Sequence, residues 1–121
     1  MSTLNHLEEL KDLEAALAES SSRPVMLFKH SSRCPVSHSA NRNFLSFADG
    51  YEAEDVAFYH LDLIRFRHIS NAIADRLGVQ HESPQALLVV NGQAVWHTSH
   101  SIPEKALDKA IQSALYAQKQ G

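Results

Sequence analysis

Residues 25–37 read VMLFKHSSRCPVS, which predicts a strand, a short loop and the beginning of a helix. Residues 25–28 form a continuous apolar run, typical of a strand that is buried on both faces of a sheet. The loop ends at Cys34, and Pro35 suits the first position of a helix because its missing N–H would lack a partner there. The sequence therefore predicts a cysteine at the point where a buried strand is followed by a helix.

The segments around this stretch alternate between helical and strand patterns. Leucines recur at helical spacing over residues 3–19, which predicts one amphipathic helix at the N-terminus. The helix that follows the cysteine is expected to end at Asp49-Gly50. Residues 56–61 are rich in apolar and aromatic side chains and predict a second strand.

The C-terminal half is predicted to hold a helix, a hairpin and a final helix. Gly78 follows an apolar helical pattern and is typical of a helix end. Asn91-Gly92 is a strong signal for a two-residue turn because both positions tolerate positive φ, so residues 86–90 and 93–97 are expected to pair. An apolar stripe over residues 107–115 predicts the last helix.

Taken in order, these elements predict an α/β fold with a four-stranded mixed sheet flanked by helices and an extra N-terminal helix. A strand–helix–strand unit implies a parallel pair with a right-handed crossover, and the hairpin adds an antiparallel pair. The chain has 121 residues, of which 44% are hydrophobic. This size suits a single domain that spans residues 1–121.

Composition and charge narrow the classes of function. The 11 Lys and Arg residues and 14 Asp and Glu residues give a net charge of −3, so neither nucleic-acid nor membrane binding is expected. The longest apolar run is far too short to span a membrane, and the first residues lack the pattern of a signal peptide. One cysteine excludes an internal disulfide and a multi-cysteine zinc site. These features favour a reducing, cytoplasmic location.

The predicted position of Cys34 favours a reactive thiol. The first turn of a helix has unpaired N–H groups and a partial positive charge, and both stabilise a thiolate. Lys29 and Arg33 lie nearby in sequence and add positive charge. The alternative is a buried cysteine that only fills space, but the junction between strand and helix favours the reactive form.

The cysteine motif resembles that of a known family. Residues 34–37, Cys-Pro-Val-Ser, are similar to the Cys-Pro-x-Cys motif of thioredoxin-like oxidoreductases, with Ser37 in place of the second cysteine. Residues 28–37 resemble the signature of the YtxJ family, the monothiol bacilliredoxins, although Arg33 stands where threonine is more usual. The resemblance covers nearly the whole chain and includes Ser83-Pro84, where this superfamily places a cis-proline that faces the active cysteine.

This resemblance implies a thioredoxin-like fold and a monothiol thiol–disulfide oxidoreductase. Cys34 would remove bacillithiol, or a similar low-molecular-weight thiol, from mixed disulfides on client proteins. Ser37 cannot resolve the new disulfide because a hydroxyl cannot replace a thiolate, so a second thiol must finish the cycle. Bacillithiol is then a co-substrate, and no bound cofactor or metal is implied.

Eight residues are candidates for this site, with Cys34 as the nucleophile. Three residues are expected to stabilise its thiolate: Arg33, Ser37 and Lys29. Four residues are expected to bind the substrate: His30, Pro35, Ser83 and Pro84. For His30, a role in packing the loop is an equally good interpretation.

Three alternatives remain open at this stage. Cys34 and His38 lie four residues apart and could form half of a metal site, but ordinary surface histidines or a charge effect of His38 on the thiol explain the spacing as well. Two copies of the chain could share an iron–sulfur cluster through Cys34, as single-cysteine glutaredoxin-like proteins do. The fold could also be a non-catalytic binding module.

Overall fold

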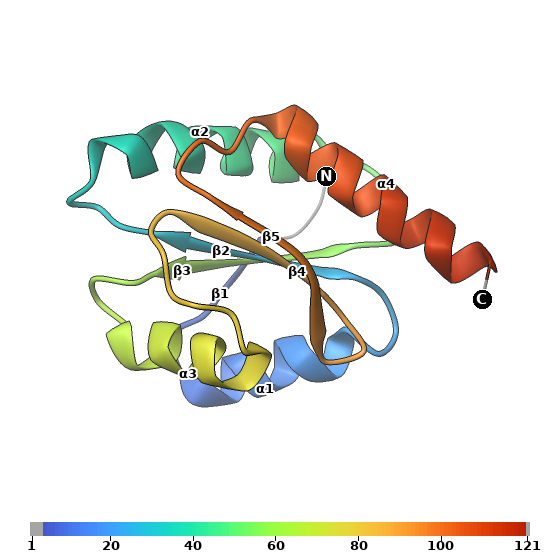
Figure 1. Cartoon of the computed structure of the whole chain (residues 1–121), viewed down its shortest axis with the longest axis horizontal. Helices are drawn as coiled ribbons and strands as arrows, with labels where there is room; N and C mark the ends of the chain where they lie inside the picture. Colours follow the sequence, from blue (N-terminus) through green and yellow to red (C-terminus); the bar gives the residue numbers. More distant parts are fainter. Residues whose placement is uncertain (1–3, 121) are drawn as a thin grey trace.

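A computed structural model describes residues 4–120, which form one five-stranded sheet covered by helices on both faces (Figure 1). The strands are β1 (Leu4–His6), β2 (Val25–His30), β3 (Ala57–Asp62), β4 (Gln85–Val90) and β5 (Gln93–Ser99). The helices are α1 (Leu10–Glu19), α2 (Pro35–Gly50), α3 (Arg67–Leu77) and α4 (Glu104–Gln120).

The sheet is mixed, with the strand order β1-β3-β2-β4-β5. Both β1 and β2 run parallel to β3, whereas β4 is antiparallel to β2 and β5 is antiparallel to β4. The α/β class and the mixed sheet are therefore confirmed. The hairpin is confirmed as well, because Asn91 and Gly92 adopt φ values of 51° and 74° between β4 and β5.

The N-terminal segment differs from the single helix predicted over residues 3–19. Leu4–His6 is a strand that pairs with β3, and the helix begins only at Leu10. The Asp12 carboxylate accepts hydrogen bonds from the backbone N–H groups of Glu8 and Glu9, at 3.0 and 2.9 Å, and so caps the start of α1. The sheet thus has five strands and not four. Residue 3 lies outside the described residues.

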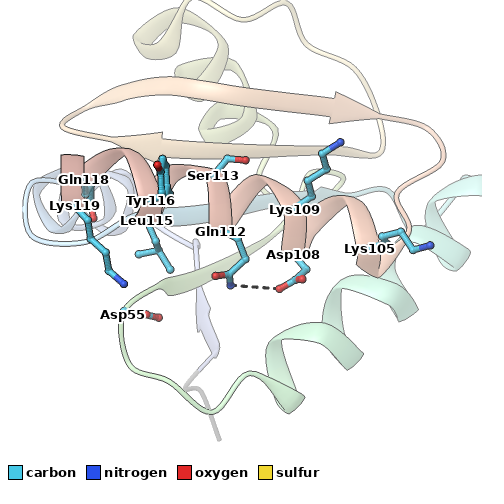
Figure 2. A pocket seen from close by; sticks show the side chains of 10 residues that line it. All are labelled: Asp55, Lys105, Asp108, Lys109, Gln112, Ser113, Leu115, Tyr116, Gln118 and Lys119. Carbon is cyan, nitrogen blue, oxygen red and sulfur yellow. Dashed lines mark hydrogen bonds between the residues drawn. The ribbon is translucent and has the colours of Figure 1, made fainter. Parts of the chain in front are cut away.

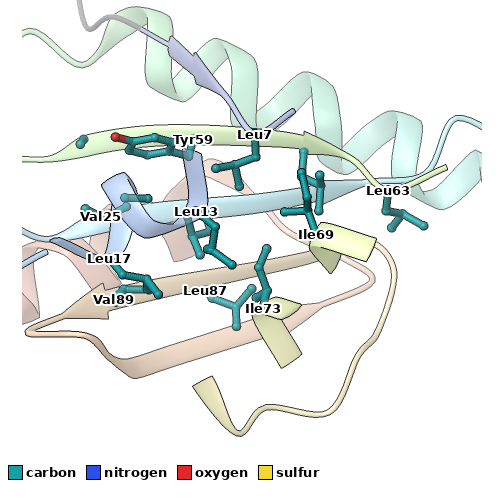
Figure 3. Close-up of a cluster of buried hydrophobic side chains, with 14 residues drawn as sticks. Leu7, Leu13, Leu17, Val25, Tyr59, Leu63, Ile69, Ile73, Leu87 and Val89 are labelled. Atoms are coloured by element: carbon teal, nitrogen blue, oxygen red, sulfur yellow. The ribbon is translucent and has the colours of Figure 1, made fainter. Parts of the chain in front are cut away.

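Each face of the sheet carries its own hydrophobic cluster. In Figure 1, α2 and α4 cover one face and α1 and α3 cover the other. Successive side chains of a strand point to opposite faces, so Met26 and Phe28 pack towards α2 and α4, whereas Val25 and Leu27 pack towards α1 and α3. Figure 3 shows the cluster that contains Val25 and Leu27, where β2, β3 and β4 pack against α1 and α3. The central strand β2 is buried on both faces, as its apolar run predicts.

Candidate active site

Cys34 occupies the N-cap position of α2. Its backbone is extended, with φ −112° and ψ 118°, and its carbonyl accepts hydrogen bonds from the N–H groups of Ser37 and His38 at 3.0 and 3.3 Å. Pro35 is the first helical residue, as predicted, and is exposed. The Cys34 side chain is partly exposed. The thiol therefore lies at the positive end of a 16-residue helix and is within reach of solvent.

A short loop joins β2 to Cys34, and Ser37 holds this loop against the helix. The Ser37 side chain is fully buried, and its Oγ accepts a hydrogen bond from the Ser31 N–H at 2.9 Å. The Ser31 carbonyl in turn accepts a hydrogen bond from the Cys34 N–H at 3.2 Å. A second hydrogen bond, of 2.8 Å, joins Ser37 Oγ to Nδ1 of His30.

The sequence predicts that Ser37 donates a hydrogen bond to the thiolate, whereas the structure assigns its hydroxyl other partners. Within residues 4–120, Ser37 Oγ bonds to Ser31 and His30, and Cys34 has no side-chain hydrogen bond at the helix start. The serine that replaces the second cysteine therefore shapes the loop that precedes the thiol.

Lys29 is not brought to the thiol, contrary to the prediction that its charge acts there. Its side chain is buried on the opposite face of the sheet, where Nζ donates to the Ser70 carbonyl at 3.4 Å and to Nδ1 of His81 at 3.2 Å. Burial lowers the pKa of Lys29 from 10.5 to about 8. The reason is the alternation of a strand: His30 faces α2, so its neighbour Lys29 must face α3. Arg33, by contrast, is exposed and directly precedes Cys34.

Four histidine rings lie in a row that ends at His38 on α2, the helix whose N-cap residue is Cys34. The sequence did not predict this arrangement. His6, His60, His30 and His38 come from β1, β3, β2 and α2, with successive ring centroids 6.0, 5.8 and 5.7 Å apart. We call these four residues the histidine row. If β1 had been predicted, the pairing of His6 with His60 across β1 and β3 would have indicated the row, but the sequence pattern of residues 3–19 predicts a helix.

Burial disfavours the charged form of the inner members of the row. Burial, followed by the neighbouring His30 and His6, lowers the pKa of His60 to about 4, and its Nε2 bonds to Oδ1 of Asn41 at 2.7 Å. Burial also lowers the pKa of His30, with a further contribution from His38. At the outer end, Nε2 of the exposed His38 bonds to the Ser32 carbonyl at 3.0 Å.

The Ser83–Pro84 peptide bond is cis, which confirms that prediction. Pro84 directly precedes β4, and the antiparallel pairing of Lys29 with Gln85 places it beside the end of β2 and the loop to Cys34. Pro84 itself is buried. The buried oxygens Ser83 Oγ and Gln85 Oε1 have no hydrogen-bond partner within residues 4–120. Pro84, which is far from His30 and Cys34 in sequence, thus lies near them at one end of the interior strands β2 and β4.

Other surface features lie away from the end of the sheet where Cys34 and Pro84 are found. The depression drawn in Figure 2 has a volume of about 990 Å³ and runs along the outer side of α4, with Asp55 opposite the helix. It contains none of the predicted site residues. In the part of the chain that the structure describes, no group of three or more His, Cys, Asp or Glu side chains is arranged to hold a metal ion, and no helix is long and apolar enough to cross a membrane.

Comparison with known protein families matches residues 5–107 to the family described as monothiol bacilliredoxin BrxC. The chain belongs to this family. A solved structure whose description gives it a thioredoxin fold is 33% identical, with a TM-score of 0.77, over 88% of this chain and 92% of the other. Bacilliredoxin membership and this relative identify the chain as a thioredoxin-like thiol oxidoreductase.

More distant structures support the fold alone. The Malassezia sympodialis thioredoxin is 18% identical, with a TM-score of 0.74, over 93% of this chain and 91% of its own. Spinach chloroplast thioredoxin f is 19% identical, with a TM-score of 0.72, over 93% of this chain and 94% of its own. The predicted thioredoxin-like fold is therefore confirmed.

Proposed function

We propose that this member of the bacilliredoxin family is a monothiol enzyme of the cytoplasm that removes bacillithiol from mixed disulfides on client proteins. The observation that carries the proposal is the position of Cys34, the one cysteine of the chain, which is partly exposed at the amino end of α2. A helix N-terminus stabilises the thiolate, which is the attacking form in thiol–disulfide exchange.

In the first step, the Cys34 thiolate attacks the bacillithiol sulfur of the mixed disulfide. A disulfide forms between Cys34 and bacillithiol, the disulfide to the client breaks, and the client cysteine leaves as a thiolate that takes up a proton from water. No net oxidation occurs, because one disulfide replaces another. Arg33, which is exposed and directly precedes Cys34 in the chain, adds positive charge to this part of the surface.

In the second step, another thiol must release bacillithiol from Cys34. Ser37 has a hydroxyl and cannot form a disulfide, so a free low-molecular-weight thiol or a cysteine of a partner protein supplies the two electrons. Its thiolate attacks the bacillithiol sulfur, which leaves Cys34 reduced and carries bacillithiol away as a new disulfide. In this cycle bacillithiol enters with the mixed disulfide and leaves in the new disulfide, and the chemistry needs no bound cofactor.

The substrate is expected to lie along the edge formed by Pro35, Ser83 and Pro84. An extended peptide segment with its disulfide over Cys34 would place its backbone beside the residues around Pro84, where main-chain groups pair as in strand addition. Pro35 is exposed next to the thiol and offers an apolar contact. His30 is also a candidate for substrate binding from the sequence, but its Nδ1 is already bonded to Ser37.

A transfer assay tests this function. A client protein with one cysteine is prepared as its mixed disulfide with bacillithiol, and in parallel with glutathione and with coenzyme A, and intact mass follows both proteins. We expect a Cys34–bacillithiol adduct and free client thiol, formed fastest from the bacillithiol disulfide. Cys34→Ser should abolish transfer, whereas Ser39→Ala, an exposed position of the same helix, should leave the rate unchanged. Absence of transfer from all three disulfides would contradict the proposal.

A further inference from the structure

The hydroxyl of Ser37 has one proton to donate, and its oxygen is hydrogen-bonded to two neighbours, Ser31 and His30. Its Oγ already accepts from the Ser31 N–H at 2.9 Å, and the 2.8 Å bond to Nδ1 of His30 holds one hydrogen atom between the two heavy atoms. When Nδ1 of His30 is unprotonated, this hydrogen belongs to Ser37. When Nδ1 carries a proton, His30 is the donor and the Ser37 hydroxyl proton must point elsewhere.

Cys34 is the acceptor towards which this proton can turn. Cys34 is the N-cap residue of α2 and Ser37 is the third residue of its first turn. In a capping box the side chain of the third helical residue reaches back to the backbone of the N-cap residue, so a side chain at position 37 can lie beside Cys34. Ser37 is fully buried, so its hydroxyl has no access to water as an alternative acceptor.

We propose that His30 is a positioning residue that controls, through Ser37, whether a hydroxyl donor faces the Cys34 thiolate. The proposal rests on the proposed function only in taking Cys34 as the reactive group. A His30 that donates from Nδ1 frees the Ser37 hydroxyl for the thiolate, and a His30 that accepts at Nδ1 withdraws it. The protonation states of His30 and Cys34 are thereby coupled.

The surroundings of His30 determine which state it adopts. From β3, Asp62 favours a protonated His30, whereas His60 stands 5.8 Å away as a neutral imidazole. From α2, His38 stands 5.7 Å away and disfavours the charge. His6 on β1 lies next to His60, with ring centroids 6.0 Å apart. Burial is the largest influence and lowers the pKa of His30. A neutral His30 that carries its proton on Nε2 accepts at Nδ1, and protonation as the pH falls turns Nδ1 into a donor.

A second titration in the reactivity of Cys34 is the expected consequence. The rate of alkylation of Cys34 by iodoacetamide, measured from pH 5 to 9 by intact mass, should show an inflection below pH 6.5 in addition to that of the thiol. His30→Asn retains a side chain able to bond to Ser37 but cannot titrate in this range. With its amide oxygen accepting from the Ser37 hydroxyl, this variant should lose the inflection and react at least about tenfold more slowly than the wild type at pH 5.5, since a hydrogen bond to a charged group is worth about tenfold or more. At pH 8.5 its rate should lie within about twofold of the wild type.

A double-mutant comparison separates this role from a merely structural one. In Ser37→Ala the inflection should also disappear, and adding His30→Asn to that variant should change the profile no further. His68→Asn, an exposed position on α3, is the matched control and should keep the wild-type profile. An effect of His30→Asn that persists in the Ser37→Ala background would overturn the proposal, as would a wild-type profile in either single variant.

Nitrogen-15 NMR of the imidazoles gives a measurement that needs no variant of His30. We expect Nδ1 of His30 to gain proton occupancy in the thiolate form relative to the protein alkylated at Cys34, and an unchanged Nδ1 would refute the coupling. Neither experiment uses a mixed disulfide or a client. A failed transfer assay with the alkylation profile intact therefore rejects the proposed function, whereas the reverse result rejects only this inference.

Discussion

Two neighbouring residues at the end of β2 have opposite surroundings. The His30 side chain faces α2 and bonds to Ser37, while the Lys29 side chain lies fully buried under α3. A basic residue five positions before a cysteine would be expected to act on it, but the alternation of side chains along a strand sends this one to the other face. Lys29 instead meets Ser70 and His81, without a carboxylate among its hydrogen-bond partners in residues 4–120.

Substitution of Lys29 by methionine should remove one part of the pH dependence of stability. The pKa of Lys29 is lowered from 10.5 to about 8 in the folded protein. Below pH 8 the ammonium is charged in both states and its burial lowers the free energy of unfolding. Between about pH 8 and 10.5 the folded protein loses the proton first, so the free energy of unfolding rises with pH, by about 3 kcal/mol at most.

Urea unfolding at pH 7 and pH 10 under reducing conditions measures this effect. We expect Lys29→Met, which keeps a similar volume, to be more stable than the wild type at pH 7 and to lack the rise towards pH 10. Lys105→Met, at an exposed position of α4, is the control and should retain the wild-type dependence. Equal pH dependence in Lys29→Met and the wild type would show that the buried ammonium is not the cause.

At the scale of elements, the ends of helices follow local backbone chemistry. α3 ends at Gly78, which adopts φ +67° and donates its N–H to the Ala74 carbonyl at 2.9 Å. Only glycine adopts this left-handed conformation without steric cost. Gly50, the last residue of α2, has no such φ, and a Cβ added at either glycine would meet no atom within 4 Å. Substitutions at these two positions therefore distinguish the effect of backbone conformation from the effect of packing.

Gly78→Ala should be destabilising by about 1 kcal/mol, because a Cβ in the left-handed region is strained. Gly50→Ala should be neutral or stabilising by up to about 1 kcal/mol, since alanine is the better helix former. Chemical denaturation of both variants beside the wild type measures the difference. A similar loss of stability in both would mean that something other than the positive φ at Gly78 decides the effect.

At the scale of the whole molecule, the sheet separates two cores, and only one of them supports the thiol. The Phe44 side chain from α2 stacks on Phe28 of β2, with ring centroids 4.7 Å apart and an interplanar angle of 11°. This contact fixes α2, and with it Cys34, on the sheet. Leu87 is equally buried but belongs to the cluster on the other face, with α1 and α3.

Conservative substitutions in the two cores should therefore differ in their effect on the site. Phe44→Leu and Leu87→Val each leave a small cavity, which should lower the free energy of unfolding by about 1 to 1.5 kcal/mol. We expect Phe44→Leu to change the alkylation rate of Cys34 at pH 7 more than twofold and Leu87→Val to leave it within twofold. Equal changes in both rates would indicate that the site responds to overall stability and not to the seating of α2.

The sequence by itself determined the features that depend on a few neighbouring residues. Pro35 begins α2, Gly78 ends α3 and Asn91-Gly92 turns the hairpin, because φ preferences act within a single turn. Cys34 at a helix N-terminus follows from the same local signals, and the motif around it indicates the family. The tertiary structure alone decided that Leu4–His6 is a fifth strand, that Lys29 faces away from the thiol, and that four histidines form a row beside Ser37. The fifth strand and the row depend on pairing between strands that are far apart in sequence, and the surroundings of Lys29 depend on which face of the sheet α2 and α3 cover. No local pattern encodes either.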